Sequence, residues 1–123
     1  MIQSTKLKYV SLKELTINGD YNFYGIIYDA TFPSQDDLPN QYYCSIKIID
    51  KDINRLNNPN NFNDEIVNVI IKSNSKENLP YIHQFGDIIR IQRGKFTYKS
   101  NKNVYLNLSS QGSKSTWTIY SSK

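Results

Sequence analysis

Tyrosines close to lysines are the residues of this chain with the clearest potential for binding chemistry. The chain has ten tyrosines, and the segment Tyr98–Tyr105 also contains Lys99 and Lys102. An aromatic ring can stack on a nucleic-acid base while a neighbouring cation contacts a phosphate. Tyrosine also suits a half-buried strand, so many of the ten are expected to be ordinary sheet or core residues. The segment is a candidate surface for single-stranded nucleic acid.

The basic residues are concentrated in the last third of the chain. The net charge is +4, but residues 1–87 hold 8 basic and 11 acidic residues, whereas residues 88–123 hold 7 basic and no acidic ones. This placement favours a basic face that meets phosphates, because neutralising a polyanion releases its condensed counterions. The alternative is that these side chains only solvate a β-surface.

No pattern in the sequence supports catalysis or a bound cofactor. The chain lacks a glycine-rich phosphate loop, a nucleophile elbow and an HExxH motif. His83 is the single histidine and is expected to be structural, and the aspartates are scattered over turns and strand ends. Cys44 is the single cysteine, so neither a disulfide framework nor a zinc site is expected. We predict a protein that is not an enzyme and holds no metal or cofactor.

The length of 123 residues fits one domain with a real core. The N-terminus lacks the apolar run of a signal peptide, and no stretch has the length of a membrane span. We therefore expect no membrane partner and a location in the nucleus or cytoplasm.

Alternating apolar residues predict six strands that would position the candidate side chains. In the fifth, Tyr105 points outward between Val104 and Leu106, and Cys44 falls on the apolar face of the second. Trp117 in the last strand is expected to plug the core. The expected strands cover residues 23–30, 43–49, 65–72, 88–96, 103–109 and 116–120.

The connections between these strands differ in character. Gly25 and Gly94 lie inside strands and are expected to mark the bends or bulges of a closing barrel. Thr31–Gln41 is expected to be a loop, and the asparagine-rich Lys51–Asp64 a mobile insertion between the second and third strands.

A short helix is expected after the third strand. Ser75 can cap it and Gly86 can end it, and Pro80 fits only in its first turn. Its apolar side chains would pack against the barrel: Leu79, Ile82 and Phe85. Five strands with a helix between the third and fourth is the order of the all-β oligonucleotide/oligosaccharide-binding (OB) fold, a Greek-key barrel. Residues 1–123 are predicted to form one such domain, with an extra C-terminal strand.

Three segments resemble one family of such barrels. They are Phe23–Pro33 (FYGIIYDATFP), Tyr42–Asp50 (YYCSIKIID) and Leu79–Arg93 (LPYIHQFGDIIRIQR). In order and wording they are similar to the first OB domain of the telomere end-binding protein alpha subunit and the protection-of-telomeres proteins, over roughly Tyr9 to Tyr120. That family normally has at least a second barrel, which would make this chain the first domain of a longer protein.

The resemblance implies binding of single-stranded, guanine-rich telomeric DNA at the 3′ overhang in the nucleus, with roles in chromosome-end protection and telomerase regulation. The implied groove crosses the second and third strands and is bordered by the loops that join strands one to two and four to five. A second telomere-protein subunit or a telomerase component is a further implied partner. Carried over by position, the DNA-binding candidates are Tyr28, Asp29, Thr31, Phe32, Gln41, Tyr43, Lys47, Lys72, Arg93, Tyr98, Lys99, Lys102 and Tyr105.

Two departures from the family pattern leave other functions open. The first loop carries Asp36 and Asp37 where the family tends to place lysines, and Tyr98 falls one place before the family's aromatic position, which is Lys99 here. The acidic loop would fit an OB module that binds a protein of a telomere or telomerase complex. A generic single-stranded DNA-binding protein would use the same stacking and charge without preferring guanine.

Overall fold

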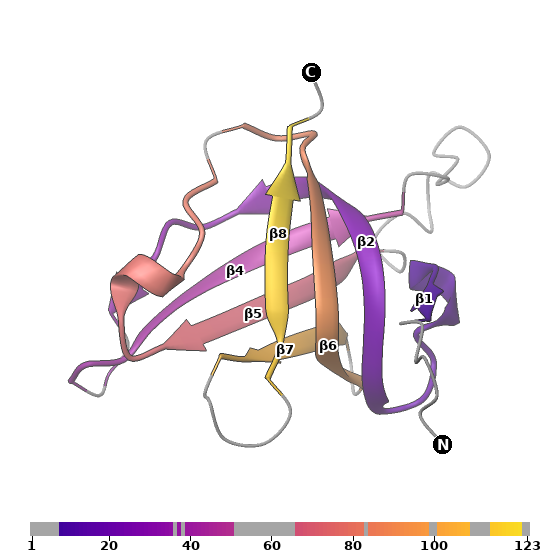
Figure 1. Cartoon of the computed structure of the whole chain (residues 1–123), viewed down its shortest axis with the longest axis horizontal. Coiled ribbons are helices and arrows are strands. Elements are labelled where there is room, and N and C mark those ends of the chain that lie inside the picture. Colours follow the sequence, from indigo (N-terminus) through magenta and orange to yellow (C-terminus); the bar gives the residue numbers. More distant parts are fainter. Residues whose placement is uncertain are drawn as a thin grey trace, which may run out of the picture.

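The computed structural model describes residues 8–35, 37, 39–50, 66–82, 84–98, 101–108 and 114–121, most of which lie in strands (Figure 1). Two single turns of 3-10 helix, labelled η, accompany them. In chain order the elements are β1 (Tyr9–Val10), η1 (Leu12–Glu14), β2 (Gly19–Ala30), β3 (Ser34–Gln35), β4 (Tyr42–Ile49), β5 (Val67–Ser73), η3 (Lys76–Asn78), β6 (Ile88–Tyr98), β7 (Lys102–Asn107) and β8 (Thr116–Tyr120).

Five strands close into a barrel in the order β2, β4, β5, β7 and β6, because β6 pairs back onto β2. Its strand pairs are antiparallel except β5 with β7, which is parallel. The additional strand β8 pairs with the first half of β6, so that in Figure 1 β8, β6 and β2 lie in front and β4 and β5 pass behind them. This strand order is that of the OB fold, which confirms the predicted barrel and its extra C-terminal strand.

The core is built from the inward residues of the alternating strands. Phe23, Ile46, Val69, Ile91 and Val104 are all fully buried, one from each barrel strand. Cys44 is also fully buried, as predicted, and its burial raises the pKa of the thiol from 9.0 to about 11. Burial stabilises each such side chain by roughly 1.5–3 kcal/mol, so this alternation supplies much of the driving force for closure.

The predicted bends lie at residues other than the two glycines. The pairing of β2 with β4 shifts register at Tyr28, and the pairing of β2 with β6 shifts opposite Arg93, whose φ is 59°. Gly25 serves close packing instead: a Cβ at this position would lie 2.6 Å from Ile48 Cδ1. Gly94 is similarly crowded by side chains of β6 and β7. The prediction of a bend or bulge is therefore wrong for Gly25, whereas Gly94 directly borders the register shift at Arg93.

The segment between β5 and β6 is less helical than predicted. Among the described residues of this segment only the three of η3 are helical, and Leu79 that follows is extended, with ψ 144°. The cause is Pro80, because the residue before a proline avoids the helical region. Ile82 and Leu79 are buried as predicted, but Phe85 is 58% exposed and does not pack in the core.

The side chain of Trp117, which was expected to plug the core, lies on β8. Trp117 packs against the core but is only half-buried. His83 and the insertion Lys51–Asp64 lie outside the described residues. Within the described ranges, no helix is long and apolar enough to cross a membrane, and no three His, Cys, Asp or Glu side chains group as metal ligands.

Candidate nucleic-acid interface

Two adjoining hollows run over β7 and form the candidate interface. The larger, of about 690 Å³, is lined by Gln41, Lys72, Ser73, Asn74, Asn78, Leu106, Asn107 and Leu108. The smaller, of about 380 Å³, is lined by Asp20, Arg93, Lys95, Tyr105, Leu106, Asn107 and Ser115. Leu106 and Asn107 belong to both, so the hollows meet at β7. We call their combined surface the β7 groove.

Strand register explains why aromatic and basic side chains meet in this groove. Lys95 on β6 lies directly opposite Tyr105 on β7, and Tyr105 lies opposite Ile70 on β5. Two residues further along, Lys72 pairs with Asn107. Residues paired in this way share one face of a sheet, here the outer face of the barrel. Tyr105 is 41% exposed there, which leaves part of its ring open to a stacking base.

The bulge at Arg93 changes which residues of β6 face the core and which face outward in the second half of the strand. Before the bulge the odd-numbered residues of β6 face the core, as the buried Ile91 shows. After it the even-numbered residues do, as the buried Phe96 shows. The same shift points Lys95 outward into the groove, where uninterrupted alternation would have pointed it into the core.

Ser115 fixes this bulge against the end of β7. Its side chain is 2% exposed, and its hydroxyl donates to the Arg93 carbonyl at 2.6 Å and accepts from the Asn107 N–H at 2.9 Å. The Ser115 N–H also donates to the Asn107 carbonyl at 2.7 Å. On the other side, the Arg93 N–H donates to Asn22 Oδ1 at 2.8 Å. Two groove residues are thus held by bonds to their backbones, and their side chains extend from a fixed frame.

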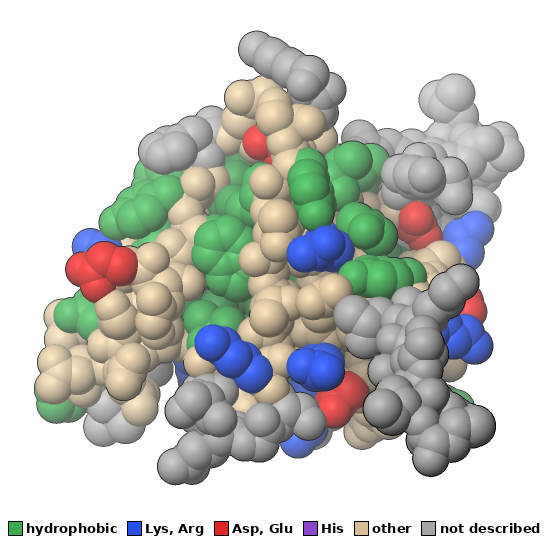
Figure 2. All heavy atoms as spheres, viewed as in Figure 1, with side chains coloured by type: hydrophobic (Ala, Val, Ile, Leu, Met, Phe, Trp, Pro, Cys, Tyr) green, Lys and Arg blue, Asp and Glu red, His purple; other side chains and the backbone are tan. Residues whose placement is uncertain are grey.

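The electrostatics of the groove favour an anion. Among the described residues, three basic side chains line it, Lys72, Arg93 and Lys95, against one carboxylate, that of Asp20. Figure 2 shows basic side chains gathered over the lower ends of β6 and β8, beside an acidic one. Cations spaced along a groove suit the repeated phosphates of a nucleic-acid strand.

Of the thirteen candidates from the sequence, Gln41, Lys72, Arg93 and Tyr105 line the β7 groove. Tyr43 and Lys47 are exposed on β4, at the positions opposite Lys72 and Asn68 on β5. They extend the same outer face toward the region that the resemblance implies.

The first-loop candidates do not line the groove. Thr31 binds β4 through its backbone and side chain, since its Oγ1 accepts from the Ser45 N–H at 3.0 Å. Asp29 Oδ1 accepts from the Ala30 N–H at 2.9 Å. Phe32 is 56% exposed, with its ring centroid 5.9 Å from that of Tyr81, and Tyr28 occupies the bulge of β2.

The hairpin candidates are divided between two faces. Tyr98 pairs with Lys102. It lies on the same face of β6 as the buried Phe96, with 6.5 Å between the two ring centroids. It is 51% exposed because it lies past the last buried residue of β6. The one-residue offset seen in the sequence therefore puts Tyr98 at the barrel rim, away from the face of Tyr105. Lys99 lies outside the described residues.

Sequence reasoning missed several groove residues. Lys95 was missed because the bulge at Arg93 changes the face on which it lies; the adjacent Gly94 indicated a bend here, but not this exchange of faces. Asn107, two residues after Tyr105, shares its outward face by the same alternation but was not among the candidates. Asn74 and Asn78 occupy the turn after β5, where no periodic pattern applies.

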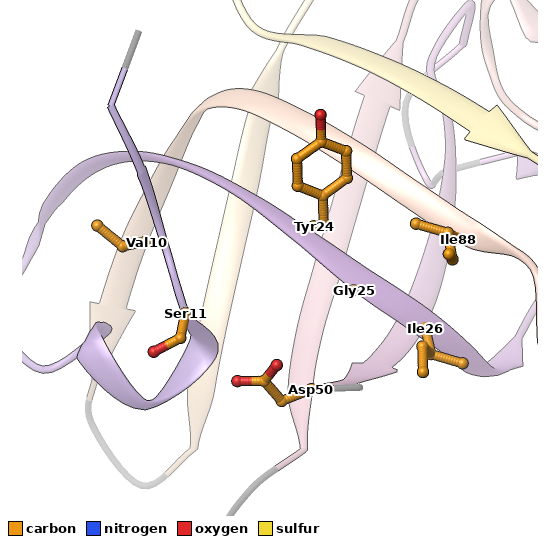
Figure 3. Close-up of a pocket in the computed structure, with 7 residues that line it drawn as sticks. All are labelled: Val10, Ser11, Tyr24, Gly25, Ile26, Asp50 and Ile88. Atoms are coloured by element: carbon orange, nitrogen blue, oxygen red, sulfur yellow. The ribbon is translucent and has the colours of Figure 1, made fainter. Parts of the chain in front are cut away.

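A third hollow, of about 380 Å³, lies apart from this groove. It is a seam where β1 and η1 cover β2 (Figure 3), and its lining is mainly apolar. Asp50 faces it and accepts the Leu12 N–H at 3.2 Å, so this carboxylate secures η1 on the barrel. With an acid and no base in its lining, the seam is unsuited to phosphate.

Comparison with known proteins gives one consistent result. A family model described as telomeric single-stranded DNA binding, POT1/CDC13, matches residues 3–123. The chain is 33% identical over 128 aligned positions to the telomere-binding protein subunit alpha of Stylonychia mytilus, covering 97% of this chain and 24% of that protein. It is 36% identical over 101 positions to a telomere-binding protein homolog of Euplotes crassus, covering 81% and 20%.

The fold comparison agrees. The chain superposes on the crystal structure of fission yeast Pot1 and ssDNA with a TM-score of 0.70 and 13% identity, over 97% of this chain and 37% of that one. At this identity the likeness shows the fold. The chain spans between a fifth and a quarter of the length of the curated relatives that it matches.

Proposed function

The chain belongs to the telomeric single-stranded DNA-binding family described as POT1/CDC13, and on that premise we propose that it binds single-stranded, guanine-rich telomeric DNA along the β7 groove. The observation that carries the proposal is the row of Tyr105 and Lys95 beside Arg93 and Lys72 on one outer face. The ring stacks a base and the cations contact the phosphates on either side. The family is described by DNA binding and not by a catalytic activity.

The wider role follows from the same premise. The relatives are named as telomere-binding proteins and as subunits. We propose that this domain acts at chromosome ends in the nucleus, in their protection and in telomerase regulation, together with a further subunit. As the chain matches only part of those relatives, we also propose that it works as one barrel of a longer protein.

Fluorescence anisotropy with labelled oligonucleotides tests the proposal. A guanine-rich telomeric repeat should bind better than a scrambled strand of equal length, and both much better than duplex DNA, whose bases are not available to stack. The logarithm of the affinity should fall linearly with the logarithm of salt concentration, at about −0.7 per phosphate neutralised. Equal affinity for the repeat and the scrambled strand would indicate a generic single-stranded DNA-binding protein without a preference for guanine.

The groove itself is tested by Lys95→Ala, with Lys13→Ala as its control. Both lysines are exposed, but Lys13 lies on η1, away from the groove. Lys95→Ala should weaken binding to all single strands and make the salt slope shallower by about 0.7, and Lys13→Ala should change neither. If the folded domain does not bind DNA even at low salt, the alternative function, an OB module that binds a protein, would be supported instead.

A further inference from the structure

The larger hollow of the β7 groove has a lining that suits a base better than a phosphate. Four of its side chains are carboxamides, and two leucines, a serine and a lysine complete it. Its volume of about 690 Å³ falls within the roughly 300–1,000 Å³ typical of ligand pockets. We call it the amide pocket, formed by Gln41, Lys72, Ser73, Asn74, Asn78, Leu106, Asn107 and Leu108.

Hydrogen-bonding chemistry makes the distinction between base and phosphate. A carboxamide presents an acceptor oxygen beside two N–H donors. A phosphate offers acceptors alone, so it leaves the amide oxygen without a partner. Guanine offers the acceptors O6 and N7 together with an exocyclic amino donor, and a single-stranded base exposes all of them. A carboxamide can therefore pair with the N1–H and O6 groups of guanine, or with its exocyclic amino group and N3, where a donor lies beside an acceptor. It matches the amino group and N7 of adenine as well, so the choice of guanine follows from the guanine-rich strand of the proposed function.

The side chains are also placed to meet such a ligand. Asn78 Nδ2 donates to Ser73 Oγ at 3.3 Å, a bond that orients the amide within the turn after β5. None of the hydrogen bonds among the described residues uses the side-chain amide of Gln41 or Asn74, and both residues are exposed. Leu108, which is half-buried, gives the pocket an apolar surface against which a flat ring can lie.

We propose that the amide pocket is a guanine-selecting subsite, in which Asn74 and Asn78 bind an edge of one base and Lys72 contacts a phosphate beside it. The proposal rests on the proposed function, because it requires DNA in the β7 groove. It assigns the preference for guanine to the turn after β5 rather than to the tyrosines, which stack on every base.

The test pairs protein variants with modified bases. The chain is titrated with a guanine-rich repeat and with two series of modified strands. In the first series one guanine at a time is replaced by inosine, and in the second by 7-deazaguanine. Inosine lacks the exocyclic amino group, and 7-deazaguanine lacks N7. In the wild type, the modification at the bound position should weaken binding about 3- to 10-fold, the effect of losing one or two hydrogen bonds.

The same modification should cost almost nothing further in Asn74→Ala or Asn78→Ala, because the protein partner is already gone. Such coupling identifies a direct contact, which a merely structural effect of the substitution would not produce. Gln84→Ala is the matched control: its amide is exposed and lines neither hollow, so it should keep the full discrimination.

Full discrimination in both asparagine variants, at every guanine and for both modifications, overturns the subsite. Absence of binding by the wild type overturns the proposed function as well, and this is seen before any variant is made. Thermal unfolding of each variant guards against loss of folding. Asn74 makes no side-chain bond in the turn, so Asn74→Ala decides the matter if Asn78→Ala fails to fold.

Discussion

Tyr105 lies between Lys95 on β6 and Ile70 on β5, its direct neighbours across the sheet. Tyr105→Ala should weaken binding of single-stranded DNA by about 1–3 kcal/mol and leave the salt slope nearly unchanged, because the ring stacks on a base without neutralising a phosphate. Fluorescence anisotropy at several salt concentrations measures both quantities.

Tyr120→Ala is the control for this substitution. Tyr120 is 42% exposed, almost equal to Tyr105, but it lies on β8 with Arg90 over its ring at 5.9 Å. Its loss should leave DNA affinity unchanged. If Tyr105→Ala instead lowers the melting temperature and leaves the affinity of the folded fraction intact, the ring is an ordinary cross-strand contact and not a stacking platform.

At the scale of single residues, alternation predicts faces only as far as the next bulge. It correctly placed Tyr105 outward between Val104 and Leu106. It failed for Lys95, beyond the bulge at Arg93, because one extra residue exchanges the two faces. Arginine is not among the residue types that favour positive φ, so Arg93 itself did not indicate the bulge, and the bend expected at the adjacent Gly94 did not predict which face Lys95 would take.

At the scale of elements, Ser115 joins the β6 bulge to the end of β7. Ser115→Ala would leave the Arg93 carbonyl and the Asn107 N–H without their buried partner, and each such group costs about 1–3 kcal/mol. We expect a comparable fall in the free energy of unfolding, measured by urea titration. DNA affinity should fall as well, since both residues line the groove.

Thr116→Ala offers a comparison from the next position. Thr116 is exposed, and its hydroxyl bonds the Gln92 side chain at 2.9 Å, outside the groove. It should change stability by well under 1 kcal/mol and leave DNA binding intact. Equal effects of the two substitutions would contradict a special role for Ser115.

Close packing between β2 and β4 gives a second prediction at this scale. Gly25→Ala should destabilise the barrel by about 1–3 kcal/mol, because the new Cβ would meet Ile48 Cβ at 2.8 Å as well as its Cδ1. Trimming Ile48 to alanine should not restore stability, since its Cβ remains. Gly19→Ala is the control: its Cβ would meet nothing nearer than 3.9 Å, so urea titration should show little loss.

These elements also show where sequence information ends. Five barrel strands and β8 were predictable because their apolar period of two is uninterrupted over several residues. The expected helix was not, because Pro80 acts on the conformation of Leu79 more strongly than the apolar spacing acts on the segment. The role of Gly25 depends on Ile48, a contact between distant positions that only the closed barrel creates.

At the scale of the whole molecule, the concentration of basic residues after Ile88 does not translate into one uniform face. Arg93 and Lys95 enter the groove, whereas Arg90 donates to Thr118 Oγ1 at 3.2 Å on the outer side of β8. Lys72, from the acidic part of the sequence, joins the groove through the β5–β7 pairing. The basic surface is thus a product of topology as much as of composition.

The free energy of unfolding should depend on pH through the buried thiol of Cys44. Its pKa is raised to about 11 in the folded barrel by burial, so the thiol stays protonated there while an unfolded chain loses the proton from about pH 9. A raised folded pKa contributes stability that is present below the unfolded pKa and is lost as pH rises toward the folded one.

Relative to Cys44→Ala, the wild type should lose about 1.4 kcal/mol of unfolding free energy between pH 7 and pH 10, measured by urea titration at each pH. The comparison cancels the titration of tyrosines and lysines, which both proteins share. Parallel curves would show that the thiol ionises as easily in the barrel as in the unfolded chain. Water would then have to reach the core at Cys44.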